Sequence, residues 1–173
     1  MRAWQKARMV RLLILDVDGV LTDGRIVIDD RGMESKSFDV KDGHGLRLIM
    51  RADVQVVFLS GRESEATRHQ ASELGVMEVY QNIHKKVDVY EQILKDHGVE
   101  DRQVGYVGDD VIDLPVLKRV GFSAAVADAS EEVKRFVDYV AMREGGRGAV
   151  REIIEFILKS QGRWEEVTAR YHR

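Results

Sequence analysis

The sequence predicts an α/β protein with a doubly wound, mostly parallel sheet and helices on both faces. Short apolar runs typical of strands alternate along the 173 residues with amphipathic stretches typical of helices. Most residues in these runs are apolar and consecutive, a pattern that is typical of strands buried on both faces. Since crossovers between parallel strands are right-handed, the carboxyl ends of the strands are expected along one edge of the sheet.

The expected elements follow one another in chain order. We predict strands over 12–17, 55–59, 78–80, 103–107, 122–126 and 139–142. Helices are predicted up to residue 74, over 85–97, from 110 to 120, from 130 onward and over 149–161. The segment 25–38 breaks the alternation, because it holds two strand-like runs around an Asp-Asp-Arg-Gly turn. We interpret it as a β-hairpin, inserted after the first strand and spanning about 24–40 with its flanks.

Composition predicts one globular domain over residues 1–173. The chain has a single proline and no Ser/Gly-rich spacer, which argues against a second domain. The stretch 162–173 follows the last predicted helix with mixed charge and aromatic residues, and by itself it predicts a frayed C-terminal tail.

Charge and cysteine content exclude several classes of partner. The 27 basic and 30 acidic residues give a net charge of −3, too close to zero to indicate nucleic acid or an anionic membrane surface. The absence of cysteine excludes disulfides and sulfur-ligated metals, and no apolar stretch is long enough to span a bilayer. We therefore expect a cytoplasmic enzyme that acts on a small molecule.

Two carboxylates, Asp16 and Asp18, end the first apolar run. Alternate side chains of a strand point the same way, so the two acids are expected to emerge together at the strand's carboxyl end. Open α/β folds bind ligands at that edge. Two acids that close a buried strand are costly unless they are paired, so a purely structural use is hard to find.

Polar residues follow the other predicted strands at the same edge. Ser60 ends the second strand, Lys86 lies at the next helix start and Asp109 ends the strand after that. The set suits a mechanism in which Asp16 attacks phosphorus, Asp18 moves the proton, and Ser60 and Lys86 hold phosphate oxygens. Mg²⁺ prefers hard oxygen ligands, which Asp16, Asp109 and a backbone carbonyl would supply.

Several of these residues also have ordinary structural interpretations. Ser60 and Glu63 have the spacing of a capping box, with Ser60 as the N-cap. Asp109 or Asp110 can cap the helix that follows. Lys85 and Lys86, taken alone, are typical of solvated helix charges.

The four motifs resemble those of the haloacid dehalogenase superfamily of phosphatases. The matching segments are Asp16-Val17-Asp18-Gly19-Val20-Leu21-Thr22, Leu59-Ser60-Gly61-Arg62, Lys86 and Gly108-Asp109-Asp110-Val111-Ile112-Asp113. The resemblance implies that Asp16 is the nucleophile, and that Asp18 is the general acid/base and binds Mg²⁺ through its main-chain carbonyl. It implies phosphate binding by Ser60, Gly61 and Lys86, metal binding by Asp16 and Asp109, and support from Thr22, Asp110 and Asp113. Lys85 competes with Lys86, and the alignment of the following apolar residues favours Lys86.

Further segments resemble the 3-deoxy-D-manno-octulosonate 8-phosphate (KDO 8-phosphate) phosphatase family over nearly the whole chain. They are Phe38-Asp39-Val40-Lys41-Asp42-Gly43-His44-Gly45, Tyr106 to Val116 and Gly145-Gly146-Arg147-Gly148-Ala149-Val150-Arg151-Glu152. This resemblance implies hydrolysis of KDO 8-phosphate in lipopolysaccharide synthesis. It also implies a homotetramer whose hairpins pack together, with the tail and the loop Gly145–Gly148 able to cover an active site.

The spacing of the motifs independently predicts a phosphatase without a cap domain. Between Thr22 and Ser60 there is room for the hairpin and one helix, and between Arg62 and Lys86 for one helix and a short strand. An active site needs cover from water, so a neighbouring subunit is a reasonable source of it.

Arg62 favours a sugar acid as the substrate, because a guanidinium can take a carboxylate with two hydrogen bonds. Related nonulosonate 9-phosphate phosphatases often carry an acidic residue at this position. Lys41, Asp42, His44 and Arg147 are further candidates for substrate binding, although His44 can also be a turn residue.

Two alternatives come from other functional classes. A phospho-receiver also uses an aspartate, Mg²⁺, a hydroxyl and a lysine, but it normally places its acidic pair and its phosphoacceptor on different strands. An idle oligomerisation module of the same fold would have no reason to keep Asp16, Asp18, Lys86 and Asp109 together.

Overall fold

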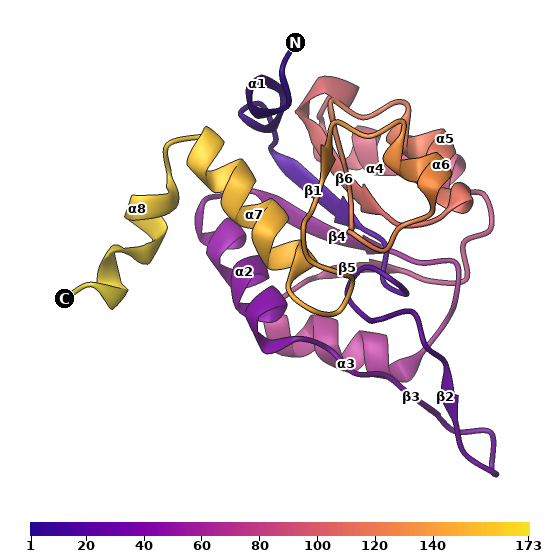
Figure 1. The fold of residues 1–173 in the computed structure, drawn as a ribbon. Coiled ribbons are helices and arrows are strands. Elements are labelled where there is room, and N and C mark those ends of the chain that lie inside the picture. The colour runs from indigo at the N-terminus through magenta and orange to yellow at the C-terminus, as the bar shows by residue number, and fades with distance from the viewer.

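The computed structural model describes residues 1–173 and contains a six-stranded sheet of order β5-β4-β1-β6-β7-β8. Every neighbouring pair in it is parallel, and β1 lies between β4 and β6 (Figure 1). Its strands are β1 (Leu12–Leu15), β4 (Gln55–Leu59), β5 (Glu78–Tyr80), β6 (Val104–Gly108), β7 (Phe122–Ala125) and β8 (Tyr139–Val140). The predicted parallel α/β fold is confirmed.

Helices connect the strands and cover both faces of the sheet. The α-helices are α1 (Ala3–Ala7), α2 (Val40–Arg51), α3 (Glu65–Leu74), α4 (Lys86–His97), α5 (Leu114–Leu117), α6 (Glu131–Lys134), α7 (Ala149–Ser160) and α8 (Trp164–Thr168). Three short 3₁₀ helices are η1 (Asp101–Gln103), η2 (Val111–Asp113) and η3 (Ala169–Tyr171). Helices α1, α2, α3 and α7 pack in one layer and α4 with α5 in the other (Figure 1).

The core is the sheet and the inner faces of these helices. It comprises 43 buried apolar residues, and all four residues of β1 are fully buried. Strand β1 is central and apolar on both faces, so helices pack above and below it and strands β4 and β6 flank it. The loop that follows β1 therefore begins at a strand that is fixed by its neighbours in the sheet.

Strand β1 ends at Leu15, two residues before the predicted end. The Asp16 amide still donates to the Val107 carbonyl at 3.0 Å, but the chain then turns. The Val17 carbonyl accepts hydrogen bonds from the amides of Val20, Leu21 and Thr22 at 2.9–3.2 Å. This turn lifts Asp18 away from the sheet while Asp16 stays at its edge.

The predicted helix over 110–120 is two shorter pieces, η2 and α5. The Asp110 carboxylate caps η2 by accepting from the Val111 amide at 2.7 Å, which confirms the capping interpretation for Asp110. Pro115 lies in the first turn of α5, where a missing amide hydrogen costs nothing.

The predicted hairpin is confirmed as a separate two-stranded antiparallel sheet. Its strands are β2 (Val27–Ile28) and β3 (Glu34–Ser35), and it projects from the body of the molecule (Figure 1). Four apolar side chains of the hairpin are at least half exposed: Ile26, Val27, Ile28 and Met33. Such an exposed apolar set is typical of a surface that meets another protein.

The expectation of a frayed tail is wrong, because the C-terminal stretch folds against its own subunit. Helix α8 packs on α2 and α7, and η3 follows it. The Tyr171 hydroxyl lies 3.0 Å from both the His44 ring and the Arg51 guanidinium on α2.

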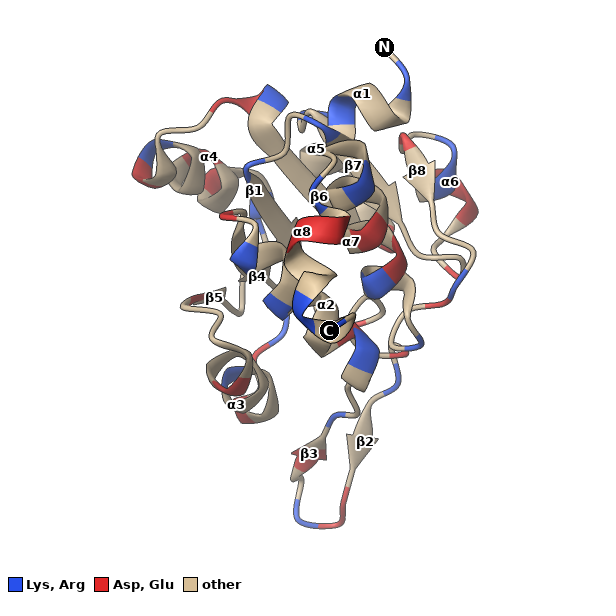
Figure 2. Cartoon of the chain, turned by 90° about the vertical axis from the view of Figure 1, so that its left-hand side faces the viewer, with Lys and Arg blue, Asp and Glu red and all other residues tan.

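Lys and Arg are interspersed with Asp and Glu along the chain, in keeping with its net charge of −3 (Figure 2). None of its helices has the length and apolar character needed to cross a lipid bilayer.

Candidate active site

Asp16 and Lys86 form a buried ion pair at the carboxyl edge of the sheet. The Lys86 ammonium lies 3.0 Å from Asp16 Oδ1 and 2.7 Å from Asp113 Oδ1, and its side chain is 1% exposed. Lys85, the competing lysine, is exposed and precedes helix α4. The structure therefore brings Lys86, and not Lys85, to the carboxylate that ends β1.

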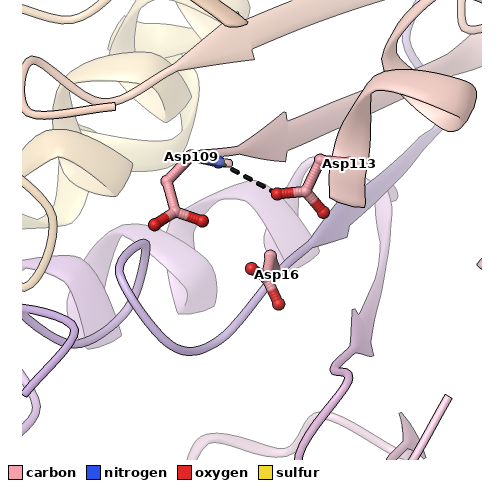
Figure 3. Close-up of side chains that lie close together, drawn as sticks. All are labelled: Asp16, Asp109 and Asp113. Atoms are coloured by element: carbon pink, nitrogen blue, oxygen red, sulfur yellow. Dashed lines mark hydrogen bonds between the residues drawn. The ribbon is translucent and has the colours of Figure 1, made fainter. Parts of the chain in front are cut away.

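Asp113 anchors this lysine from η2. Its carboxylate also accepts from the Tyr106 hydroxyl at 2.6 Å. It accepts from the Asp109 amide at 3.0 Å as well (Figure 3). Since its oxygens are engaged by these donors and by Lys86, Asp113 holds other residues in place.

Asp109 is the third carboxylate of the cluster. Oxygens of Asp16, Asp109 and Asp113 all lie within 4.8 Å of one another (Figure 3). Burial, followed by the neighbouring carboxylates of Asp16 and Asp113, raises the pKa of Asp109. Burial and Asp113 likewise raise the pKa of Asp16, although the Lys86 ammonium opposes them.

The cluster has the donor set of a hard cation. Lys86 contacts Asp16 and Asp113, whereas the dominant neighbours of Asp109 are carboxylates. A divalent cation between Asp16 and Asp109 would relieve this repulsion and stabilise both charged forms. Carboxylate oxygens are the ligands that Mg²⁺ prefers, so the residues present fit that ion.

Glycines allow the loops around the cluster to approach closely. Gly19 has a φ of +86°, and a Cβ there would lie 2.0 Å from Asp109 Oδ2. A Cβ on Gly145 would lie 1.8 Å from the Gly19 carbonyl oxygen. The loop Gly145–Gly148 therefore packs directly against the loop that carries Asp18, and any side chain at these positions would force them apart.

Thr22 holds the same loop from within. Its hydroxyl oxygen accepts hydrogen bonds from the amides of Gly19 and Gly24, each at 3.2 Å. The side chain is 3% exposed, so this predicted supporting residue is placed to maintain the turn.

Ser60 lies beside Asp18 at the end of β4, and it does not cap a helix. Its hydroxyl is 3.5 Å from Asp18 Oδ2 and accepts from the Arg62 amide at 3.3 Å. Helix α3 begins at Glu65 with Ser64 as its N-cap, so the capping-box interpretation of Ser60 and Glu63 is wrong. The physical reason is that the chain makes a further turn before entering the helix.

Arg62 reaches the rim of the site but is engaged by the hairpin. Its Nη2 lies 3.0 Å from Glu34 Oε2, and its side chain is 44% exposed. A cavity of about 270 Å³ opens at this rim. Its lining comprises Asp16, Asp18, Gly61, Arg62, His84, Lys86, Asp109, Asp110 and Ile112.

The other predicted substrate residues lie elsewhere in the subunit. Lys41, His44 and Arg147 line a separate hollow of about 970 Å³ between the start of α2 and the loop before α7. His44 is a helical residue of α2, so its interpretation as a turn residue is wrong.

Asp42 has a structural position in this subunit. Its carboxylate accepts from the Arg151 amide at 2.9 Å, which satisfies a free donor in the first turn of α7, and the residue is 1% exposed. The structure therefore does not bring Asp42 to the rim with Arg62.

Besides His84, which lines the cavity, three residues near the site were not identified from the sequence. Tyr106 hydrogen-bonds Asp113 from within β6, and Lys36 and Glu34 on the hairpin reach Asp18 and Arg62. Tyr106 lies inside a largely apolar strand. A buried tyrosine hydroxyl needs a hydrogen-bond partner, so this residue could have indicated a buried polar group nearby. Nothing in the sequence marks Lys36 among the many charged residues.

A DxD carboxylate pair after β1, a serine after β4, a buried lysine on α4 and an aspartate after β6 define a haloacid dehalogenase-like hydrolase. A model of that description, "haloacid dehalogenase-like hydrolase", matches residues 63–153. The resemblance to this superfamily is thereby confirmed.

Similar proteins define the family more narrowly. The chain is 42% identical to the 3-deoxy-D-manno-octulosonate 8-phosphate phosphatase of Escherichia coli over 93% of its own length and 86% of that protein. The crystal structure of the Yersinia pestis phosphatase of that name matches with a TM-score of 0.93 and 41% identity, covering 94% of this chain and 88% of that one. The chain belongs to the 3-deoxy-D-manno-octulosonate 8-phosphate phosphatase family.

A second similar structure was solved with ligands. It is the 3-deoxy-D-manno-octulosonate 8-phosphate phosphatase from Moraxella catarrhalis in complex with magnesium ion, phosphate ion and KDO. It matches with a TM-score of 0.95 and 34% identity, over 98% of this chain and 97% of that one.

Proposed function

We propose that this chain hydrolyses KDO 8-phosphate to KDO and inorganic phosphate, as a step of lipopolysaccharide synthesis. The observation that carries the proposal is the Asp16 carboxylate, paired with buried Lys86 and facing Asp109 at the mouth of a cavity. Membership of the KDO 8-phosphate phosphatase family supports the choice of substrate.

The proposed reaction has two steps at Asp16. In the first, an oxygen of Asp16 attacks phosphorus, the bond from phosphorus to the sugar oxygen breaks, and Asp18 donates a proton to that oxygen. In the second, Asp18 takes a proton from water, which attacks phosphorus and releases phosphate from Asp16. Lys86, Ser60 and the Gly61 amide would hold phosphate oxygens during both steps. This assignment is supported by Lys86 and Gly61 in the lining of the cavity and by the Ser60 hydroxyl beside Asp18.

The proposed cofactor is Mg²⁺. Asp16, Asp109 and the main-chain carbonyl of Asp18 would hold it, with Asp110, Asp113 and Thr22 supporting the loops that carry them. When bound, the ion supplies positive charge that offsets the carboxylates and favours the charge developing on phosphate. The magnesium named in the Moraxella catarrhalis complex supports this assignment.

The proposed substrate contacts beyond the phosphate are less direct. Arg62 is at the rim and can take the sugar carboxylate if Glu34 shares its guanidinium. Lys41, His44 and Arg147 lie in the hollow beside α2, from which they would contact substrate only in a neighbouring subunit or after a loop movement.

We also propose a homotetramer in the cytoplasm. The exposed apolar residues of the hairpin support assembly, and a neighbouring subunit would cover a cavity that its own chain leaves open.

A screen of sugar-acid phosphates with and without Mg²⁺ tests the proposal. The expected result is Mg²⁺-dependent phosphate release with KDO 8-phosphate as the preferred substrate. Preference for a nonulosonate 9-phosphate would contradict the substrate assignment. A stable phosphorylated protein would instead favour a phospho-receiver, and complete inactivity would favour an oligomerisation module.

A further inference from the structure

A lysine of the hairpin is buried against the proposed acid/base residue. Lys36 follows β3, and although the hairpin projects into solvent, the Lys36 side chain is 2% exposed. Its ammonium contacts Asp18 Oδ1 and lies 3.1 Å from Glu34 Oε1. Burying an ammonium is costly unless it is paired, so this placement requires both carboxylates.

The second partner of Lys36 is itself held in place. Glu34 Oε2 accepts from Arg62 Nη2 at 3.0 Å, so the Glu34 carboxylate bridges the hairpin lysine and the rim arginine. The two cations lower the pKa of Glu34, although burial opposes them. A continuous row of alternating charges therefore runs from Asp18 through Lys36 and Glu34 to Arg62.

The Asp18 carboxylate is consequently held from two sides. Lys36 contacts one oxygen, while the Ser60 hydroxyl lies 3.5 Å from the other. Asp18 sits on a loop beyond the end of β1 and is partly exposed, so its backbone alone leaves the side chain free to rotate. The contact from Lys36, together with the longer one from Ser60, holds the carboxylate at the side of the cavity.

We propose that Lys36 is a positioning residue, which orients Asp18 toward the leaving oxygen of the substrate. The hairpin then has two features: an exposed apolar surface, and a lysine that positions the general acid. This inference rests on the proposed role of Asp18 as the general acid, and it does not depend on which sugar phosphate is the substrate.

The chemistry of the first step makes this role measurable. As the bond from phosphorus to the leaving oxygen breaks and the bond from Asp16 forms, a sugar alkoxide must receive the Asp18 proton. A nitrophenolate is stable without that proton, so an aryl phosphate reports on nucleophile, metal and phosphate binding alone. A misoriented Asp18 therefore impairs hydrolysis of a sugar phosphate selectively.

The experiment compares kcat/KM for KDO 8-phosphate and p-nitrophenyl phosphate in Lys36→Met, because kcat/KM reports the steps through transfer of phosphate to the enzyme. We expect a loss of about 100-fold for the sugar phosphate and of no more than about 3-fold for the aryl phosphate. Lys36→Arg, which keeps a cation, should recover most of the lost activity. Lys95→Met, at an exposed lysine of α4, is the matched control and should leave both values unchanged.

Equal losses on both substrates, or no loss on either, would overturn the proposal. Should Lys36→Met fail to fold, Glu34→Gln tests the same row of charges from its other end and should give the same selectivity in weaker form. If the wild-type protein prefers another sugar phosphate, the proposed substrate is wrong, but the ratio measured with that alkyl phosphate still tests Lys36. Asp18→Asn provides the full selectivity against which the Lys36 variants are judged.

Discussion

The Lys86 ammonium lies 3.0 Å from the Asp16 carboxylate, and both side chains are almost completely buried. This pair joins the end of the central strand β1 to the first turn of α4, and both residues line the cavity of the proposed phosphate site. The same ammonium also pairs with the Asp113 carboxylate, so one positive charge is shared between two carboxylates. The three carboxylates therefore exceed the one ammonium in charge, and a cation at Asp16 and Asp109 would offset the excess before an anionic phosphate binds.

Removal of the buried ammonium should destabilise the protein and abolish its activity. Lys86→Met leaves Asp16 and Asp113 without their cation, and losing one partner of a buried pair typically costs about 3–5 kcal/mol. Thermal and urea unfolding would measure that loss. Lys85→Met is the matched control: this exposed neighbour should keep wild-type stability and activity. The reverse result would assign the phosphate lysine to Lys85.

Replacement of the nucleophile should separate activity from folding. Asp16→Asn keeps an oxygen for the Val17 amide and for Lys86, but an amide oxygen does not form the phosphoenzyme. We expect no detectable phosphate release, with a circular dichroism spectrum like that of the wild type. Phosphate release at the wild-type rate would exclude Asp16 as the nucleophile.

Loss of the rim arginine should affect sugar-acid recognition. Arg62→Ala should raise KM for KDO 8-phosphate about tenfold or more, and KM for an aryl phosphate much less, since only the former carries a carboxylate. Steady-state kinetics on both substrates would measure the difference. Equal changes would show that Arg62 acts on the phosphate or on the hairpin instead.

Binding of Mg²⁺ should be coupled to proton release. Burial and the adjacent carboxylates raise the pKa of Asp109, so the metal-free protein retains a proton there above the pH at which an ordinary aspartate loses it. A cation must displace that proton, and affinity should therefore rise with pH, by at most about tenfold per pH unit, until Asp109 is ionised. Calorimetry in buffers of different ionisation enthalpy would count the protons released. A pH-independent affinity would contradict the assignment of Asp109 as a ligand.

Asp42 should influence stability without taking part in catalysis. Its carboxylate caps α7, and Asp42→Ala should lower the free energy of unfolding by about 1–2 kcal/mol. Urea unfolding would measure the change. Asp42→Asn retains an acceptor and should keep most of the stability.

The same residue makes a pH prediction with a definite sign. Burial raises the pKa of Asp42 from 3.8 to about 6, although hydrogen bonds from the Arg151 and Gly148 amides oppose it. Between these values the folded protein holds a proton that the unfolded chain has lost. Asp42 therefore makes stability fall as pH rises from about 4 to about 6, by at most about 3 kcal/mol. That contribution should be missing in Asp42→Asn, and an unchanged pH profile would contradict it.

The strands and the proposed catalytic positions could be predicted because both depend on local patterns. Largely apolar runs marked β1, β4 and β6, and the polar residue after each run marked the edge of a parallel sheet. Lys86 was harder to distinguish from Lys85, because the choice depends on where α4 begins and which face it buries.

Contacts between distant segments could not be predicted in the same way. Ser60 has the sequence of a capping box, yet an additional turn gives that position to Ser64. Asp42 belongs to a family-like motif, yet its carboxylate caps a helix more than a hundred residues further along the chain. In each case the local pattern has two uses, and the packing of other elements selects one.

Sequence patterns alone were enough to predict the parallel α/β fold and the carboxylates, serine and lysine that lie along one edge of the sheet. Strand period and right-handed crossovers leave little freedom in that placement. Three contacts became visible only in the folded chain: Lys36 with Asp18, Glu34 with Arg62 and Tyr106 with Asp113. Those pairings depend on how the hairpin and η2 fold back over the sheet, which is set by long-range packing and the need to pair buried charges.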